Sequence, residues 1–193
     1  MFAVRIHGRG GQGAVTAAEL LSVAAFDEGR HAQAFPTFGS ERTGAPVVSF
    51  CRIDDRAIRL REPITDPDAL IVQDPTLLHQ VNLFAGLKSD GFLVLNTSHP
   101  LDELGLEDLL QRLTLKHAVT VPATEIAREQ LGRPLPNAAL LGAFAALTGQ
   151  VSLGAVCDAI RDRFPGEVGS GNARAAGAAH EHVRTSLRRL NDA

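Results

Sequence analysis

The chain of 193 residues is 45% hydrophobic and 21% charged, with a formal net charge of −3 at pH 7. This length suits one α/β domain of good size or two cramped ones, and the charge excludes a protein that holds a nucleic-acid backbone by a global basic field. The two cysteines, Cys51 and Cys157, are too few and too far apart for a disulfide-rich scaffold, a C-x-x-C site or a self-contained iron–sulfur cluster.

The sequence shows no pattern typical of export or of membrane insertion. Residues 1–7 contain Arg5 and run directly into a glycine-rich turn, unlike a signal peptide. The longest uncharged stretch, residues 134–157, is interrupted by prolines and glycines, and its apolar part is only residues 138–147. A membrane-spanning helix needs about 20 apolar residues. We therefore expect a cytoplasmic protein without a membrane span.

Hydrophobic patterning predicts strands along the first two thirds of the chain. Apolar and polar residues alternate over residues 2–7, which predicts a first strand. A glycine-rich turn follows, and small residues at helical spacing then predict a helix from Ala14 to a C-cap near Gly29. Further short runs of β-forming residues predict five more strands: 31–35, 47–53, 69–72, 92–95 and 118–121.

Helical patterns fill the remainder of the chain. Asp74 before Pro75 predicts a capped helix start. Other helical segments are expected at 101–113, 124–131, 138–148, 153–164 and about 172–190. Strands that alternate with helices predict a three-layer, Rossmann-like α/β fold, with a mostly parallel sheet, helices on both faces and a helical C-terminal third. Since no linker or repeat interrupts this pattern, we expect residues 1–193 to form a single domain.

The strongest functional motif is the turn after the first strand. Its six residues match G-x-G-x-x-G and are Gly8, Arg9, Gly10, Gly11, Gln12 and Gly13. Glycines allow a tight turn and let the backbone approach an anion, and the helix that starts at Ala14 supplies unpaired N–H groups. The motif, placed between a strand and a helix, predicts a phosphate or pyrophosphate site. The alternative is a tight glycine turn that binds nothing.

The second strand and the loop after it indicate which phosphate ligand fits. A nicotinamide site needs a carboxylate about 20 residues beyond the motif, but this strand ends at Phe35 and Pro36. The loop that follows contains Ser40, Glu41, Arg42 and Thr43. Because arginine binds phosphate oxygens bidentately, the loop admits a nucleotide with an additional ribose phosphate, such as NADP or coenzyme A. The alternative is a solvated loop with a surface Glu41–Arg42 pair.

Other polar residues predict binding more than catalysis. Asn137 begins an apolar helix, where its side chain either caps the helix or faces the nucleotide across the cleft. His7 ends the first strand and is interpreted as a positioning or core residue rather than a general base. His180 and His182 are two residues apart and do not share a helix face, so no metal site is expected. The sequence contains no G-x-S-x-G nucleophile elbow, and Ser40 has no evident base partner, so we expect no catalytic residue in this chain.

Several segments in the same order resemble the gamma subunits of pyruvate/2-oxoacid:acceptor (ferredoxin) oxidoreductases. They are GRGGQGAVTAAELL (8–21), QAFPTFGSERTGAPVVSF (33–50), IRLR (58–61), IVQDPTLL (71–78), GRPLPNAALLGA (132–143) and RFPG (163–166). The resemblance implies a subunit of an enzyme that decarboxylates a 2-oxoacid oxidatively, forms its acyl-CoA and passes electrons to ferredoxin or NAD. It also implies that Gly8–Ala14 cradle the pyrophosphate of coenzyme A, that Ser40, Arg42 and Thr43 face its phosphates, and that Asn137 contacts it.

The resemblance also implies that partner chains carry the redox chemistry. Thiamine diphosphate, Mg and 4Fe–4S clusters would lie on alpha-, beta- and delta-type subunits, since this sequence lacks their signatures; Ser89-Asp90-Gly91 is the nearest approach to the thiamine-diphosphate motif. Ferredoxin or an NAD-reducing subunit would accept the electrons. Two alternatives remain at this stage. One is a stand-alone NADP-binding reductase, and the other is a purely structural subunit with a vestigial glycine turn.

Overall fold

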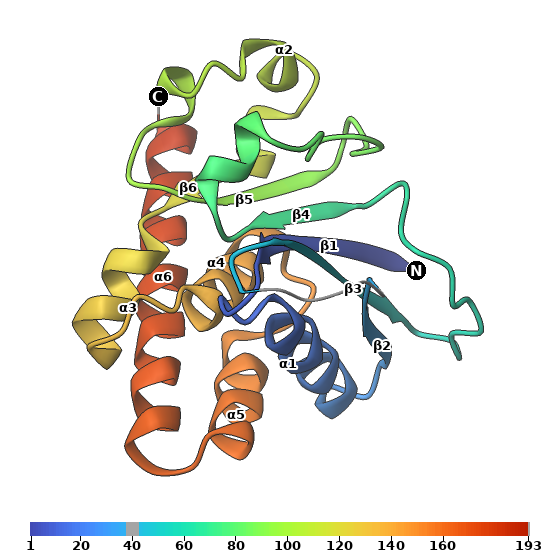
Figure 1. The fold of residues 1–193 in the computed structure, drawn as a ribbon, viewed down its shortest axis with the longest axis vertical. Coiled ribbons are helices and arrows are strands. Elements are labelled where there is room, and N and C mark those ends of the chain that lie inside the picture. Colours follow the sequence, from blue (N-terminus) through green and yellow to red (C-terminus); the bar gives the residue numbers. More distant parts are fainter. Residues whose placement is uncertain (38–42, 193) are drawn as a thin grey trace.

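The computed structural model describes residues 1–37 and 43–192, which form one six-stranded sheet with helices packed against it (Figure 1). The strand order is β2-β3-β1-β4-β5-β6. β1 pairs in parallel with β4, β4 with β5 and β5 with β6, whereas β3 is antiparallel to both of its neighbours. The strands are β1 (Phe2–Arg9), β2 (His31–Pro36), β3 (Pro46–Asp54), β4 (Ala69–Val72), β5 (Phe92–Asn96) and β6 (Ala118–Val121).

All six predicted strands are present, and the mostly parallel sheet is confirmed, since β3 alone runs against the other strands. The segment predicted to be an amphipathic helix at 101–113 differs from expectation. It forms only a 3-10 turn (Leu101–Glu103) and the short helix α2 (Glu107–Leu110). Gly105, between the two, has a φ of +65°, a conformation that ends a right-handed helix.

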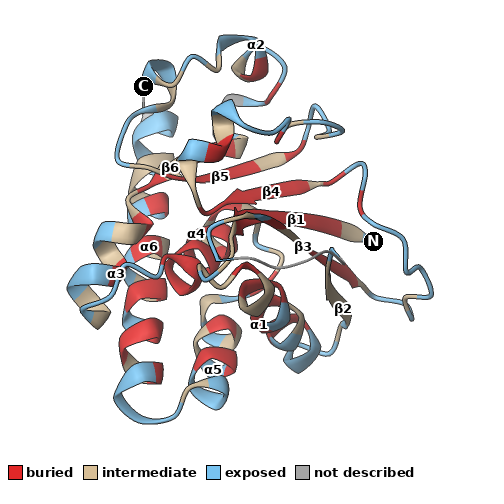
Figure 2. Cartoon of the chain, in the orientation of Figure 1, coloured by how far each residue is buried: buried red, intermediate tan, exposed pale blue. Residues whose placement is uncertain are grey.

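Long helices cover one face of the sheet and short ones cover the other. The long ones are α1 (Ala14–Asp27), α3 (Ala123–Leu131), α4 (Asn137–Thr148), α5 (Leu153–Arg163) and α6 (Gly166–Asp192). Their buried residues join those of the sheet in one large core (Figure 2). On the opposite face of β4 and β5, a smaller leucine-rich cluster lies under the 3-10 helix η1 (Pro75–His79) and α2. Both faces are therefore covered, but unequally.

The C-terminal helices pack more closely than the sequence indicates. α6 begins at Gly166, six residues before the predicted start, because its glycine-rich first turns have a weak helix preference but fit tightly against neighbouring backbone. A Cβ at Gly169 would overlap the carbonyl oxygen of Phe164, and one at Gly142 in α4 would overlap that of Ala176 in α6. α4, the central helix, is buried along nearly its whole length. None of the helices in residues 1–37 and 43–192 is long and apolar enough to cross a membrane.

Candidate functional site

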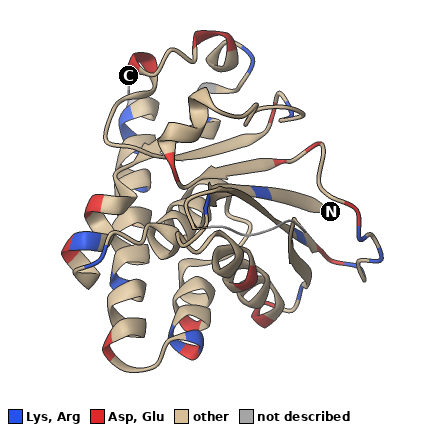
Figure 3. Ribbon diagram, viewed as in Figure 1, with Lys and Arg blue, Asp and Glu red and all other residues tan. Residues whose placement is uncertain are grey.

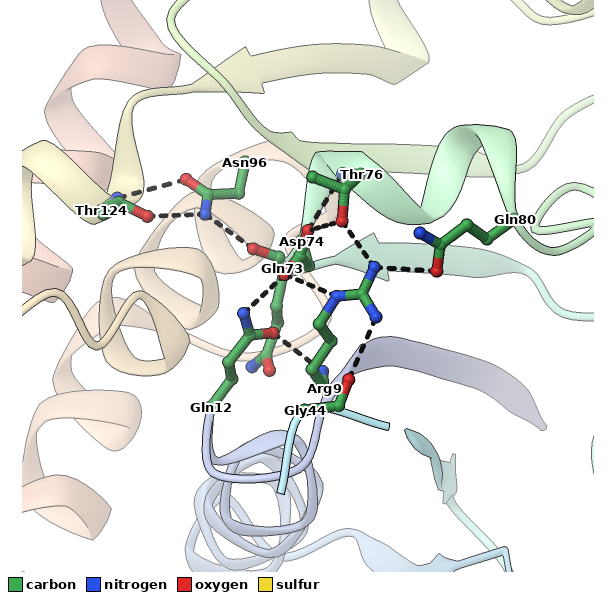
Figure 4. A network of polar contacts seen from close by, with 9 residues as sticks. All are labelled: Arg9, Gln12, Gly44, Gln73, Asp74, Thr76, Gln80, Asn96 and Thr124. Carbon is green, nitrogen blue, oxygen red and sulfur yellow. Dashed lines mark hydrogen bonds and ion pairs between the residues drawn. The ribbon is translucent and has the colours of Figure 1, made fainter. Parts of the chain in front are cut away.

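The glycine loop lies at the edge of the sheet where the parallel strands end. β1 leads into Gly10 and the loop, and α1 begins immediately after it at Ala14. β4 and β5 end at the same edge because they run parallel to β1, and they bring Gln73, Asp74 and Asn96 close to the loop (Figure 4). Ligands of open α/β sheets bind at this edge.

A pocket of about 270 Å³ opens at the loop. The Gly10 N–H donates to the Ala45 carbonyl over 2.9 Å, and the Gln12 N–H donates to the Arg9 carbonyl over 3.0 Å. The N–H groups of Gly11, Gly13 and Ala14 donate to no other described residue. The pocket is smaller than a typical small-molecule site of roughly 300–1,000 Å³, so it suits the phosphate end of a longer ligand. Its lining consists of Arg9, Gly10, Gly11, Gly13, Ala14, Val15 and Val47.

The carboxylate of Asp74 holds the loop in place (Figure 4). Its Oδ2 accepts from Arg9 Nε over 3.1 Å and from Gln12 Nε2 over 2.7 Å, while its Oδ1 accepts from the Thr76 N–H over 3.0 Å. Gln12 in turn accepts from the Arg9 N–H through its Oε1 over 2.8 Å. Asp74 therefore caps η1, as predicted, and also fixes two residues of the glycine loop. This second role was not predicted from the sequence, although a carboxylate two residues beyond a buried strand could have indicated it.

All three nitrogen atoms of the Arg9 guanidinium donate hydrogen bonds to protein groups. Besides Asp74, it donates to the Gly44 carbonyl over 3.0 Å, to Thr76 Oγ1 over 2.7 Å and to Gln80 Oε1 over 2.9 Å. These bonds join the glycine loop to η1 and to the segment before β3. The side chain of Arg9 therefore braces the glycine loop against these two segments.

The pKa of Asp74 lies below its usual value. Burial alone would raise this pKa, but hydrogen bonds from Thr76 and Gln12 and the positive charge of Arg9 outweigh burial. The carboxylate is therefore ionised throughout the physiological pH range. Its charge pairs with that of Arg9, so the network adds little net charge to the site.

A second polar layer lies beneath the loop. Asn96 donates from Nδ2 to the Gln73 carbonyl over 2.7 Å and to Thr124 Oγ1 over 2.8 Å, which ties β4, β5 and α3 together. The fully buried side chain of Gln73 lies against Gly8, where an added Cβ would be 2.6 Å from its Oε1. A side chain at Gly8 would force the buried Gln73 amide to move, which glycine avoids.

Asn137 lies directly beside the glycine loop. An added Cβ at Gly13 would be 2.7 Å from Asn137 Nδ2, and the φ of Gly13 is +76°, so both space and backbone conformation require glycine there. The interpretation of Asn137 as an N-cap was wrong. Pro136 occupies the N-cap position, and Asn137 is the first helical residue, with no capping hydrogen bond from its side chain.

The structure brings together most of the residues predicted for the site. Thr43 forms a parallel bridge with Gly10, and Asn137 lies against Gly13. Of the predicted residues, Arg9, Gly10, Gly11, Gly13 and Ala14 line the pocket itself. Ser40 and Arg42 lie outside the described residues, as does Glu41. Among the residues that are described, no group of three or more His, Cys, Asp and Glu side chains is arranged to hold a metal ion.

His7 is buried on the face of the sheet opposite α1. Burial and the neighbouring positive charge of Arg5 lower the pKa of His7 from 6.5 to about 4, so its ring is neutral at pH 7. Within residues 1–37 and 43–192, its Nε2 has no hydrogen-bond partner. The imidazole therefore lies away from the glycine loop, which agrees with a positioning or core role.

The free energy of unfolding should fall as the pH decreases from 7 toward 4. In this range the unfolded chain protonates His7 while the folded chain keeps it neutral, so acid favours unfolding, by up to about 3 kcal/mol. Urea unfolding at pH 7.5, 6 and 5 measures the slope. The variant His7→Phe should lose most of it, and an unchanged slope in that variant would contradict the assignment.

Comparison with known proteins identifies the family. The sequence profile of the pyruvate ferredoxin/flavodoxin oxidoreductase family matches residues 3–182. The chain belongs to this family. It is 50% identical over 186 residues to the common gamma subunit of the pyruvate/ketoisovalerate oxidoreductases of Pyrococcus abyssi, covering 95% of this chain and 98% of that subunit.

Solved structures agree with this assignment. The pyruvate oxidoreductase subunit PORC of Thermotoga maritima superposes with a TM-score of 0.78 and 37% identity, covering 93% of this chain and 95% of that one. The 2-oxoglutarate:ferredoxin oxidoreductase of Magnetococcus marinus shares the fold, with a TM-score of 0.71 and 18% identity, over 94% of this chain and 31% of that one. The resemblance seen in the sequence is confirmed: the chain is a gamma-type subunit of a 2-oxoacid ferredoxin oxidoreductase.

Proposed function

We propose that this subunit binds the phosphate end of coenzyme A at its glycine loop. The assembled enzyme would decarboxylate a 2-oxoacid oxidatively, form the acyl-CoA and pass electrons to ferredoxin or to an NAD-reducing subunit. Thiamine diphosphate, Mg and 4Fe–4S clusters would supply the decarboxylation and electron transfer from alpha-, beta- and delta-type partners. This chain would hold the co-substrate and contribute no catalytic residue.

The observation that carries the proposal is the set of unpaired amides at the loop. The N–H groups of Gly11, Gly13 and Ala14 donate to no other described residue, and they lie at the N-terminus of the 14-residue helix α1. Amides at such a position attract anions through their hydrogen bonds and the helix dipole. Because Arg9, Gln12 and Asp74 lock the loop from behind, its amides are preorganised for a pyrophosphate.

Strand order argues against a nicotinamide nucleotide. In a dinucleotide-binding fold, the second strand lies beside the first and presents a carboxylate to the ribose. Here the antiparallel strand β3 separates β1 from β2, and β2 ends at Pro36 without a carboxylate. The relatives are also subunits of larger oxidoreductases, which favours this reading over a stand-alone NADP-dependent reductase.

Related enzymes support coenzyme A as the ligand class. The Magnetococcus marinus enzyme was solved with 2-oxoglutarate, coenzyme A and succinyl-CoA bound, although this chain matches less than a third of that polypeptide. Anchoring the charged end of coenzyme A on this subunit would hold its thiol arm near the partner chain that carries the acyl group. Such positioning replaces a bimolecular encounter by a local one.

The proposal is tested with the assembled oxidoreductase and two matched alanine variants, Gly13→Ala and Gly29→Ala. Both glycines have positive φ, +76° and +80°, so both variants experience similar backbone strain. Only at Gly13 does the new methyl group collide with Asn137. Isothermal titration with coenzyme A should show at least a tenfold weaker affinity for Gly13→Ala and little change for Gly29→Ala, with the KM for coenzyme A raised in parallel.

Two results would contradict the proposal. If the Gly13→Ala complex bound coenzyme A as tightly as the parent complex, the glycine loop would not be the binding site, and the alternative of a purely structural subunit would be favoured. Saturable binding of NADPH to the isolated chain, followed by hydride transfer without partners, would instead indicate the reductase.

A further inference from the structure

A second hollow lies on the opposite face of the sheet from the glycine-loop pocket. Arg5 and His7 of β1 stand opposite Phe50 and Val48 of β3 in the register, so these four side chains share one face, the face away from α1. With the loops around Asp66 and Asn82 they line a hollow of about 500 Å³. This volume is within the range of small-molecule sites.

Arg5 brings a buried positive charge to this hollow, and the negative charge of Asp66 acts on it electrostatically. Its side chain is only 8% exposed, and it donates to the carbonyl oxygens of Ile64, Thr65, Leu83 and Ala85 over 3.4, 3.3, 2.8 and 2.6 Å. These acceptors are all neutral, and among the described residues no carboxylate lies within ion-pair distance of Arg5. Charged residues are sparse on the strands and gather on helices and loops (Figure 3).

Two buried nitrogen atoms of residues that line the hollow have no hydrogen-bond partner among the described residues. They are Nε of Arg5 and Nε2 of His7, which is only 7% exposed. The two residues are i and i+2 on β1, so both nitrogens belong to the same face of one strand. A buried polar group without a hydrogen bond costs about 1–3 kcal/mol, and a ligand that accepts from both groups would recover that cost.

The remaining lining determines what kind of ligand fits. Val48 and Phe50 give the hollow an apolar floor, while Asp66 is the carboxylate on its rim. Asp66 is exposed and accepts a hydrogen bond from the Thr65 hydroxyl, so water screens its charge more than that of the buried Arg5. The site thus offers two N–H donors, a positive charge and an apolar wall.

We propose that this hollow binds a carboxylate group, which accepts from Arg5 and His7 and whose carbon chain lies on Val48 and Phe50. The carboxylate belongs either to a small organic acid or to the end of a partner polypeptide. Because His7 is neutral, one of its ring nitrogens carries a proton and donates it in this hydrogen bond. This hollow is separate from the glycine loop. The proposal of a carboxylate site therefore does not depend on whether the loop binds coenzyme A.

Nuclear magnetic resonance of the full chain at pH 7 tests the proposal in two arms. The first arm titrates acetate and pyruvate, with acetamide as the neutral control. The second titrates a short peptide with a free C-terminal carboxylate, with the same peptide amidated as its control. We expect saturable shifts of the His7 ring nitrogens and of the Val48 and Phe50 amides with the acid of one arm or of both, and none with the neutral partner. The arm that saturates identifies the source of the carboxylate.

Two variants connect the binding to His7. His7→Phe removes the donor and should weaken carboxylate binding at least tenfold, whereas His7→Gln keeps an N–H group and should retain most of the affinity. Coenzyme A affinity should be unchanged in both. If neither acid produces saturable shifts, if the neutral controls bind equally well, or if His7→Phe binds as the parent does, the proposal is overturned.

Discussion

Replacing Gly142 with alanine should destabilise the chain by about 3 kcal/mol or more. The added Cβ would overlap the carbonyl oxygen of Ala176, so α4 and α6 would have to separate where they pack most closely. A carbonyl in the middle of a helix cannot rotate away as a flexible side chain can, and α4 is buried too fully to shift alone. Urea unfolding followed by circular dichroism measures the loss.

Gly177 provides the matched control for this prediction. It also lies within a long helix, α6, but an added Cβ there would meet nothing within 4 Å. Alanine at this position should stabilise the chain by about 0.5–1 kcal/mol, because glycine is a poor residue for a helix interior. Equal effects of the two substitutions would show that helix packing does not depend on the absence of a side chain at Gly142.

Replacing Asp74 with asparagine should loosen the glycine loop and cost about 2 kcal/mol of stability. The Asp74 side chain is only 12% exposed, and it accepts from Arg9, Gln12 and Thr76. Asparagine removes the negative charge and turns an amide N–H₂ toward groups that are themselves donors. In the assembled oxidoreductase, we expect coenzyme A affinity to fall about tenfold, because the loop amides are no longer held in position.

The ion pair between Arg30 and Asp55 supplies the comparison for Asp74. Its Nε–Oδ1 distance of 3.1 Å equals the Nε–Oδ2 distance of the Arg9–Asp74 pair, but the Asp55 side chain is 86% exposed. Solvent screening makes such surface pairs nearly neutral for stability, so Asp55→Asn should change neither unfolding nor coenzyme A titration measurably. A similar loss in both variants would mean that burial of the Asp74 network has no special importance.

Local patterns in the sequence were sufficient for the elements of the fold. Period-two alternation and buried β-branched runs predicted every strand, and the placement of G-x-G-x-x-G between a strand and a helix located the loop. These features depend on residues near one another in the chain. The start of α6 was predicted too late because its glycines have a weak helix preference. They fit close backbone contacts instead, such as that of Gly171 with Gln130, which is far away in the chain.

The position of β3 between β1 and β2 illustrates what local patterns do not contain. A strand that is buried on both faces has the same pattern whichever direction it runs, so neither its antiparallel pairing nor the resulting strand order could be predicted. The order matters for function, because it removes the neighbouring strand on which a nicotinamide site depends.

The sequence alone determined the alternation of strands and helices, the glycine loop and the family resemblance. Each of these can be recognised from residues that are close together within short segments of the chain. Only the tertiary structure decided that Asp74 locks the loop through Arg9 and Gln12, that Asn137 lies against Gly13, and that Arg5 and His7 share a hollow with β3. Those contacts join residues that are far apart in the chain. They exist because strand register and helix packing bring the residues together, and no short-range pattern records that geometry.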